Sequence, residues 1–322
     1  MLLAKTTNNR RTKVRFPCQK CHVPTLALAN TKRCTLKLCS DCFGKRQDLR
    51  PKELNDLSGS QWAQFSLSVQ QYPDVRSQKQ RLHGACFPLA LAKQYILKYT
   101  KQGDLVLDPF IGVGTTLDAC IQLQRSCFGT DINSYFCRTT RKALGKNTNG
   151  CQYTIRTRDA EKVGTCLRPE SIDFILTSPP YASLLKNINK TFAYKWREHS
   201  TVPSIDNPIP YTDNKQDLGN MDYAQFFDKL SRIMQQLYLV LKNKKYMACV
   251  VKDYRDLKNR SPYVNFHGDV IDCASDNNFT LWDIVIYDQT KFRPLVCLGY
   301  PSSRYYHNIG HSYILIFRKG LT

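Results

Sequence analysis

The chain has 322 residues, of which 42% are hydrophobic, and its 47 Lys and Arg against 26 Asp and Glu give a formal net charge of +21. It contains no run of about 18 apolar residues, so it excludes an evident membrane span, and its polar, basic start lacks the apolar stretch of a secretory signal. The charge favours a polyanionic partner, most simply nucleic acid, although a solvated basic surface would give the same count. The 14 cysteines are then expected to be thiols or metal ligands in a reducing compartment, the cytosol or the nucleus.

Residues 1–57 form a basic segment with 13 Lys and Arg against 4 Asp and Glu. The segment has the pattern C-x2-C-x17-C-x2-C, made by Cys18, Cys21, Cys39 and Cys42. Two such pairs of thiolates complete a tetrahedral zinc shell and leave no open position, which predicts a structural Zn²⁺ site. Cys34 and His22 are alternative ligands. Two unliganded dithiols are the other interpretation, which would leave this polar segment without a means of folding.

Residues 58–84 have little periodicity and are expected to form a connector, whereas residues 85–322 alternate between helical and strand patterns. Four helices are predicted, at 87–99, 115–124, 134–146 and 221–241. Seven apolar strands are predicted, at 104–108, 127–131, 153–157, 171–178, 246–251, 281–288 and 311–317. This alternation predicts an α/β fold with a doubly wound, largely parallel seven-stranded sheet of Rossmann-like type.

Residues 182–220 have no confident element and are predicted to form a long loop that contacts substrate. The loop mixes Lys186, Lys190 and Arg197 with Phe192 and Trp196, a mixture that suits phosphate contact and base stacking. A solvated loop with its aromatic side chains tucked onto the domain is the alternative. Two further polar groups face the same predicted sheet edge and could touch substrate: Lys252, Asp253 and Arg255, and Arg304, Tyr305 and His307.

The segment "DPFIGVGTT" at 108–116 reads as a strand end, a glycine loop and a helix start. Gly112 and Gly114 let the backbone approach a ligand, and the absence of a following Lys excludes a phosphate-binding P-loop. Asp131 ends the next strand, where a carboxylate can accept hydrogen bonds from ribose hydroxyls, and Asp159 follows the third strand and could accept from an adenine amine. Such a set of carboxylates indicates a nucleoside-bearing ligand, or else three aspartates that cap turns.

With "HGACFP" at 83–88 before it and "TSPPY" at 177–181 after it, this segment resembles the amino-methyltransferases that modify exocyclic amines of DNA bases. The resemblance covers roughly residues 80–320 and leaves out the cysteine-rich amino terminus. It implies an S-adenosylmethionine site lined by ten residues: Phe87, Asp108, Phe110, Gly112, Gly114, Thr115, Thr116, Asp131, Ile132 and Asp159.

The motif at 178–181 explains how such chemistry can proceed without a covalent nucleophile. A base amine is a weak nucleophile, and two fixed acceptors, Ser178 and the carbonyl of Pro179, can hold its two hydrogens and aim its lone pair. Pro179 and Pro180 stiffen the backbone, and Tyr181 can stack on an extruded base. Cytosine C5 methylation would need a cysteine nucleophile, and Cys18, after Pro17, is better used by the zinc pattern.

Ser at the first motif position is typical of N4-cytosine enzymes in the resembling family, so methylation of cytosine N4 in DNA is favoured over adenine N6. An RNA base-amine methyltransferase and a nucleic-acid-binding protein without turnover are the alternatives. DNA is the expected partner, and S-adenosylmethionine and Zn²⁺ are the expected cofactors.

Overall fold

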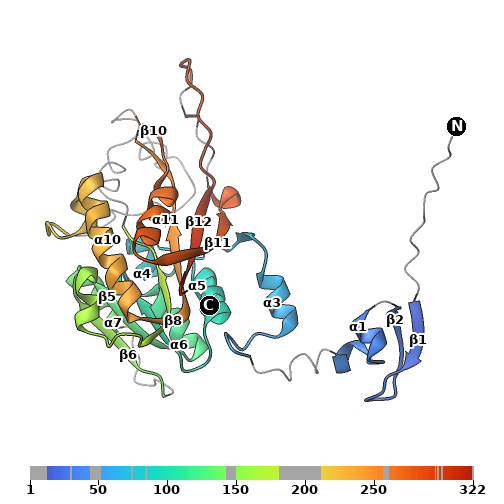
Figure 1. The fold of residues 1–322 in the computed structure, drawn as a ribbon. Coiled ribbons are helices and arrows are strands. Elements are labelled where there is room, and N and C mark those ends of the chain that lie inside the picture. Colours follow the sequence, from blue (N-terminus) through green and yellow to red (C-terminus); the bar gives the residue numbers. More distant parts are fainter. Residues whose placement is uncertain are drawn as a thin grey trace. The chain divides into compact units, whose positions relative to one another are not determined.

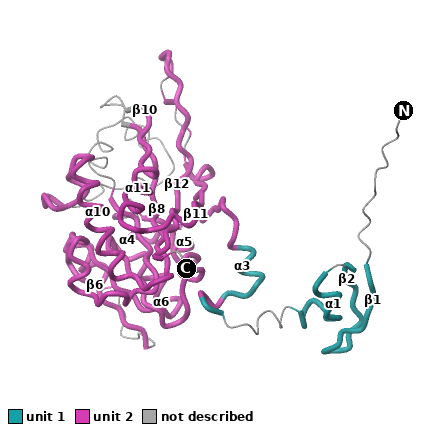
Figure 2. The backbone as a smooth tube through the Cα atoms, in the orientation of Figure 1, with its two compact units in different colours: residues 1–53, 57–64 teal, residues 54–56, 65–322 magenta. Residues whose placement is uncertain are grey.

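The structure is a computed structural model that describes residues 13–29, 31–43, 52–73, 75–83, 86–142, 150–180, 212–256, 261–293, 295, 297–298 and 300–320. The chain divides into two compact units (Figure 2). Unit 1 comprises Met1–Glu53 and Leu57–Gln64, and unit 2 comprises Leu54–Asp56 and Phe65–Thr322. The second unit therefore takes in most of the predicted connector, while the predicted limits of the two domains stay predictions. Among the described helices, none has both the length and the apolar character that a membrane span requires.

Unit 1 is built around a short hairpin and the cysteine pairs. Strand β1 (Lys13–Pro17) pairs antiparallel with β2 (Pro24–Leu28), and helices α1 (Lys32–Thr35) and α3 (Gly59–Phe65) follow. A further helical stretch spans 40–43. The buried cluster in the described part of this unit consists of Cys18, Leu38, Cys39 and Cys42. Since so few apolar side chains are buried there, this unit needs a further source of stability.

Unit 2 contains one eight-stranded sheet in the order β3-β11-β12-β8-β7-β4-β5-β6 (Figure 1). The strands are β3 (Val69–Gln71), β4 (Leu105–Asp108), β5 (Ser126–Asp131), β6 (Tyr153–Thr157), β7 (Ile172–Thr177), β8 (Leu241–Val251), β11 (Phe279–Asp288) and β12 (His311–Lys319). All neighbours pair in parallel except β12, which is antiparallel to both β8 and β11. The predicted Rossmann-like α/β fold is therefore confirmed.

Helices cover both faces of this sheet, as the two buried clusters of unit 2 demonstrate. One cluster joins the sheet to α10 (Tyr223–Val240), α11 (Phe266–Asp276) and the 3₁₀ helix η1 (Ala160–Thr165). The other joins it to α5 (Leu89–Tyr99), α6 (Thr115–Leu123) and α7 (Ser134–Lys142). The remaining elements are α4 (Gln78–His83), η2 (Leu218–Asn220), η3 (Thr290–Phe292) and a hairpin of β9 (Tyr254–Asp256) and β10 (Ser261–Val264).

All seven predicted strands and four predicted helices are present, and the structure adds elements to them. The prediction of seven strands is wrong by one, because β3 joins the sheet beside β11 through the pair Val69 and Ile286. The predicted connector at 58–84 contains α3, β3 and α4. Most of the predicted loop at 182–220 lies outside the described residues; its last part forms η2.

The pairing directions fix where the functional groups gather. Since β4, β5, β7, β8 and β11 run in the same direction, their carboxyl ends lie at one edge of the sheet. Asp108, Asp131 and Thr177 end three of these strands. The connection from β11 to β12 leaves the sheet at this same edge.

Candidate functional site

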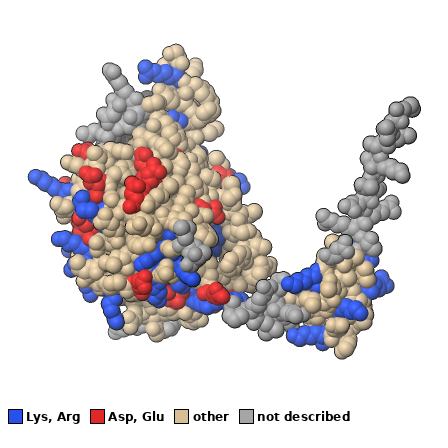
Figure 3. All heavy atoms as spheres, in the orientation of Figure 1, with Lys and Arg blue, Asp and Glu red and all other residues tan. Residues whose placement is uncertain are grey.

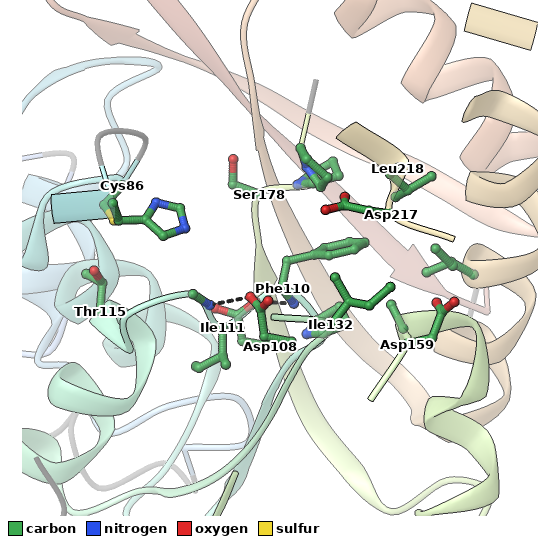
Figure 4. A pocket seen from close by; sticks show the side chains of 18 of the residues that line it. Cys86, Asp108, Phe110, Ile111, Thr115, Ile132, Asp159, Ser178, Asp217 and Leu218 are labelled. Atoms are coloured by element: carbon green, nitrogen blue, oxygen red, sulfur yellow. Dashed lines mark hydrogen bonds between the residues drawn. The ribbon is translucent and has the colours of Figure 1, made fainter. Parts of the chain in front are cut away.

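A pocket opens at the carboxyl edge of β4, β5 and β7. It encloses about 860 Å³ of space free of atoms, with the open solvent at its mouth included. In Figure 4, Cys86 and Thr115 lie at one end of the pocket and Asp159 at the other, with Phe110 between them. The lining of the pocket therefore extends across the strand ends.

Asp108 is the buried centre of a hydrogen-bond network beneath this pocket. Its Oδ1 accepts the Phe110 N–H at 3.1 Å and the Thr177 hydroxyl at 2.9 Å, and its Oδ2 accepts the Thr116 hydroxyl at 2.6 Å. Burial raises the pKa of Asp108 to about 6. The carboxyl group thus ties the glycine loop and the start of α6 to the residue that precedes Ser178.

Asp131 holds the glycine loop in place. Its Oδ2 accepts the Gly112 N–H at 2.9 Å, and its Oδ1 accepts the Asn133 N–H at 2.8 Å. Burial raises the pKa of Asp131 to about 7. Gly112 has a φ of +50°, and a Cβ added there would lie 2.8 Å from Nε2 of His83, so only glycine fits this loop.

Asp159 is engaged by a buried lysine that the sequence analysis did not single out. Its Oδ2 lies 2.5 Å from Nζ of Lys229, and its Oδ1 accepts the Glu161 N–H at the start of η1. Lys229 also donates to the Gln216 carbonyl at 2.5 Å. The side chain of Lys229, on the sheet-facing side of α10, is 1% exposed. Asp159 therefore caps a turn and forms an ion pair, and both residues line the pocket.

Ser178, Pro179 and Pro180 form the wall of the same pocket. The Ser178 hydroxyl donates to the Val250 carbonyl of β8 at 2.8 Å. Because its only proton is used in this way, the hydroxyl oxygen presents lone pairs to a further donor. Tyr181 lies outside the described residues.

The structure brings most of the predicted cofactor residues into one lining and leaves two out. Phe87, Asp108, Phe110, Gly112, Thr115, Asp131, Ile132 and Asp159 line the pocket. Among the described lining residues, Gly114 and Thr116 do not occur. Gly114 has a φ of +87° at the start of α6, where a Cβ would lie 2.6 Å from Cγ2 of Thr140, and Thr116 orients Asp108. Gly114 and Thr116 therefore support the conformation of the glycine loop without lining the pocket.

Sequence reasoning singled out no pocket-lining residue in the last part of the predicted substrate-contacting loop at 182–220 or in α10. Gln216, Asp217 and Leu218 belong to the turn of η2, and Lys229 and Ile233 belong to α10. The burial of Lys229 could have been predicted from the sequence, because this lysine falls within the apolar stripe of Phe226, Leu230 and Ile233. A lysine in such a stripe indicates a buried partner.

In unit 1 the four predicted ligands meet. The Sγ atoms of Cys18, Cys21, Cys39 and Cys42 all lie within 4.8 Å of one another, and those of Cys21 and Cys39 are 3.6 Å apart. A tetrahedral zinc ion with Zn–S bonds of about 2.3 Å separates its sulfurs by about 3.8 Å, so the cluster fits the ion. Cys34 and His22 are not part of this cluster.

Comparison with known proteins adds to this geometry. Residues 26–142 match the family model described as DNA methylase. The orphan methyltransferase M.BamHII of Bacillus amyloliquefaciens is 39% identical over 62 residues, which are 19% of this chain and 23% of the relative. Over these segments the chain is similar to DNA methyltransferases.

A second curated relative and a solved structure also match. The type II methyltransferase M.BglI of Bacillus subtilis is 33% identical over 110 residues, 34% of this chain and 30% of that relative. The match to a crystal structure of a SAM-dependent methyltransferase from Methanosarcina mazei covers 71% of this chain and 98% of that protein's chain, with 15% sequence identity and a TM-score of 0.41.

The extent of the likeness is limited. The chain spans between about a fifth and a third of the length of these curated relatives. The matched segment 26–142 includes Phe87, the motif at 108–116 and Asp131 of this chain. Asp159 and the motif at 178–181 lie beyond the segment, so their roles depend on the geometry of the pocket.

Proposed function

We propose that this chain transfers a methyl group from S-adenosylmethionine to the exocyclic amine of a base in DNA, with cytosine N4 preferred over adenine N6. The observation that carries the proposal is that the glycine loop at Gly112 and the wall of Ser178, Pro179 and Pro180 line one pocket. A cofactor site and an amine-binding wall are what this reaction must bring together.

The chemistry of the lining supports S-adenosylmethionine as the cofactor. When bound, it supplies a methyl group on a positively charged sulfur. The pocket is lined by Asp108, Asp131 and Asp217, which favour a cationic ligand, whereas the charge of Asp159 is balanced by Lys229. Ionised Asp131 would accept hydrogen bonds from ribose hydroxyls, because each of its oxygens has a lone pair left after the backbone contacts. Phe110 and Ile132 would pack against the adenine ring.

The hydrogen bond of Ser178 supports its role as the amine acceptor. A serine that already donates to Val250 can only accept from the base, and the Pro179 carbonyl would supply the second acceptor. Both acceptors are held before the base arrives, so little reorganisation is needed when the amine nitrogen changes geometry. Tyr181 would stack on the extruded base. The preference for cytosine rests on serine, rather than Asp or Asn, at position 178.

The direct test is to incubate the protein with isotopically labelled S-adenosylmethionine and either duplex DNA or RNA, and then to digest the polymer to nucleosides. We expect the label in N4-methylcytosine from DNA. Label in N6-methyladenine would reject the base preference, and label in RNA alone would reject DNA as the substrate. Cofactor binding without transfer to either polymer would favour a nucleic-acid-binding protein that has lost turnover.

We also propose that the four cysteines of unit 1 hold one structural zinc ion. The support is the spacing of their sulfurs and the small buried cluster around them. The purified protein should contain about one zinc per chain, measured by mass spectrometry of the metal. Cys39→Ser should lose the metal and Cys34→Ser should keep it. Full zinc content in Cys39→Ser would reject this ligand set.

A further inference from the structure

The connection between β11 and β12, residues 289–310, is a long arm that projects from the body of unit 2 (Figure 1). It leaves the sheet at the carboxyl edge, which is also the edge of the pocket. The amine-methylation proposal does not use this arm. An extended segment at the same sheet edge as a candidate substrate pocket is a natural place for a contact with a large substrate.

The side chains of the arm do not fit a purely structural role. Leu295 is 89% exposed, and Tyr300 and Tyr305 are each 83% exposed. Water-exposed apolar side chains gathered on one projection mark an interaction surface. These three side chains are called the apolar tip below.

The charge of the arm restricts the partner. It carries Lys291, Arg293 and Arg304, and no acidic residue follows Asp288 in the sequence. In Figure 3 the projecting part of the arm shows Lys and Arg among uncharged atoms. A surface that combines cations with exposed aromatic rings and lacks carboxylates is complementary to the phosphates and bases of a nucleic acid.

The base of the arm is fixed to the strand beside the catalytic wall. Nζ of Lys252 donates to the Ile309 carbonyl at 2.9 Å. The Gln289 N–H donates to the Gly310 carbonyl at 2.8 Å, and this bond joins the first and last residues of the arm. Arg255 donates to the His307 carbonyl at 2.9 Å, and its guanidinium carbon lies 5.2 Å from the centre of the Tyr306 ring. Lys252 follows β8 directly, two residues after the carbonyl that accepts the Ser178 hydroxyl.

We infer that the β11–β12 arm contacts the DNA duplex next to the target base, with Lys291 and Arg304 on phosphates and the apolar tip against base edges and sugars. The inference rests on the proposed function, since a base that enters the pocket leaves its flanking duplex at the carboxyl edge of the sheet. The anchors at Lys252 and Arg255 hold the arm at a constant position relative to Ser178. Duplex contact and base capture are therefore linked through β8.

The test uses the full-length protein and two arm variants. The charge variant is Lys291→Ala with Arg304→Ala, and the apolar variant is Leu295→Ala with Tyr300→Ala and Tyr305→Ala. The matched control is Arg168→Ala, an exposed arginine just before β7, at the opposite edge of the sheet. Affinity for a fluorescent 30-base-pair duplex of mixed sequence is measured by anisotropy at several salt concentrations.

The charge variant should lower the slope of log affinity against log salt by about 2, because each lost phosphate contact removes about 0.9 from it. At 0.1 M salt this corresponds to a loss of affinity of about tenfold for each contact. The apolar variant should lose at least about 30-fold with little change of slope, because it removes two aromatic rings whose contacts contribute at least about 1 kcal/mol each. Arg168→Ala should stay within about twofold of the unmodified protein, and S-adenosylmethionine affinity should be unchanged in all variants.

Three results would overturn the inference. Arm variants that bind the duplex as tightly as Arg168→Ala would show that the arm makes no contact. Equal slopes for the charge variant and the unmodified protein would remove the phosphate contacts. Tighter binding of an RNA duplex of the same sequence, lost in the same variants, would replace DNA by RNA. Because duplex binding is read without turnover, a protein that binds through the arm but transfers no methyl group would refute the proposed function alone.

Discussion

Replacement of Lys229 by methionine tests whether the floor of the pocket depends on a buried ion pair. The change keeps the length of the side chain but removes the charge that lies 2.5 Å from Asp159 and donates to the Gln216 carbonyl. Removal of one partner from a buried pair costs about 3–5 kcal/mol, because the other charge stays buried without compensation. Asp159 is 17% exposed and keeps its bond from the Glu161 N–H, so we expect the lower end, about 3 kcal/mol.

The neighbouring pair on the same helix is the matched control. Arg232 lies 2.7 Å from Glu161, but its side chain is 51% exposed. Arg232→Met should therefore cost less than about 1 kcal/mol, as surface pairs do. The measurement is urea-induced unfolding followed by circular dichroism. In the Lys229→Met background, Asp159→Asn should restore part of the stability, because it removes the uncompensated charge. Equal costs for Lys229→Met and Arg232→Met would refute the assignment of a buried, structure-bearing pair.

Three further changes probe the loop and the carboxyl groups around it. Burial raises the pKa of Asp131 to about 7. The affinity for S-adenosylmethionine, measured by calorimetry, should therefore rise about tenfold for each pH unit up to about pH 7 and then level off. The stability of the unliganded protein should fall as the pH rises from about 4 to 7, because only the folded state holds the proton of Asp131 in this range. Asp131→Asn should remove the part of both slopes between about pH 6 and 7, while Asp108, whose pKa burial raises to about 6, still titrates below that; unchanged profiles would contradict this titration of Asp131. Thr177→Val should cost about 2 kcal/mol in urea unfolding, because it removes a donor to the buried carboxyl group of Asp108; a cost near zero would argue against that network. Gly112→Ala should destabilise by at least about 1 kcal/mol more than Gly103→Ala, since both have positive φ but only the former meets a side chain, and equal costs would exclude the contact.

The strands and their ends could be predicted from the sequence because their signals are local. An apolar run that ends in Asp108, Asp131 or Thr177 marks both a buried strand and the edge where ligands bind. The addition of β3 could not be predicted in this way, since three residues carry little pattern and their pairing with Ile286 joins positions far apart in the sequence. Helix α11 was also missed, as its buried residues include Cys273 and Ala274 among polar neighbours.

The residues of the site likewise fall into those that local sequence predicts and those that depend on packing. Residues adjacent to a strand end, such as Gly112 and Ser178, were predicted to face the ligand and line the pocket. Thr116 belongs to the same motif but points to Asp108, because the first turn of α6 rotates it away from the cavity. Asp159 was expected to be available for an adenine amine, whereas its partner Lys229 lies 70 positions later in the chain. Such a pairing depends on how α10 packs, which no local pattern reveals.

The proposed reaction depends most on Ser178 as an acceptor held in place by β8, and a comparison of two serine variants tests that role. Single-turnover transfer of labelled methyl groups to DNA should fall about 100-fold in Ser178→Ala, the effect of removing one preorganised hydrogen-bond partner, with S-adenosylmethionine affinity unchanged. Ser171→Ala, at the other end of β7, removes a hydroxyl that bonds to the Arg168 carbonyl and should transfer at the normal rate. Normal transfer by Ser178→Ala would contradict the account.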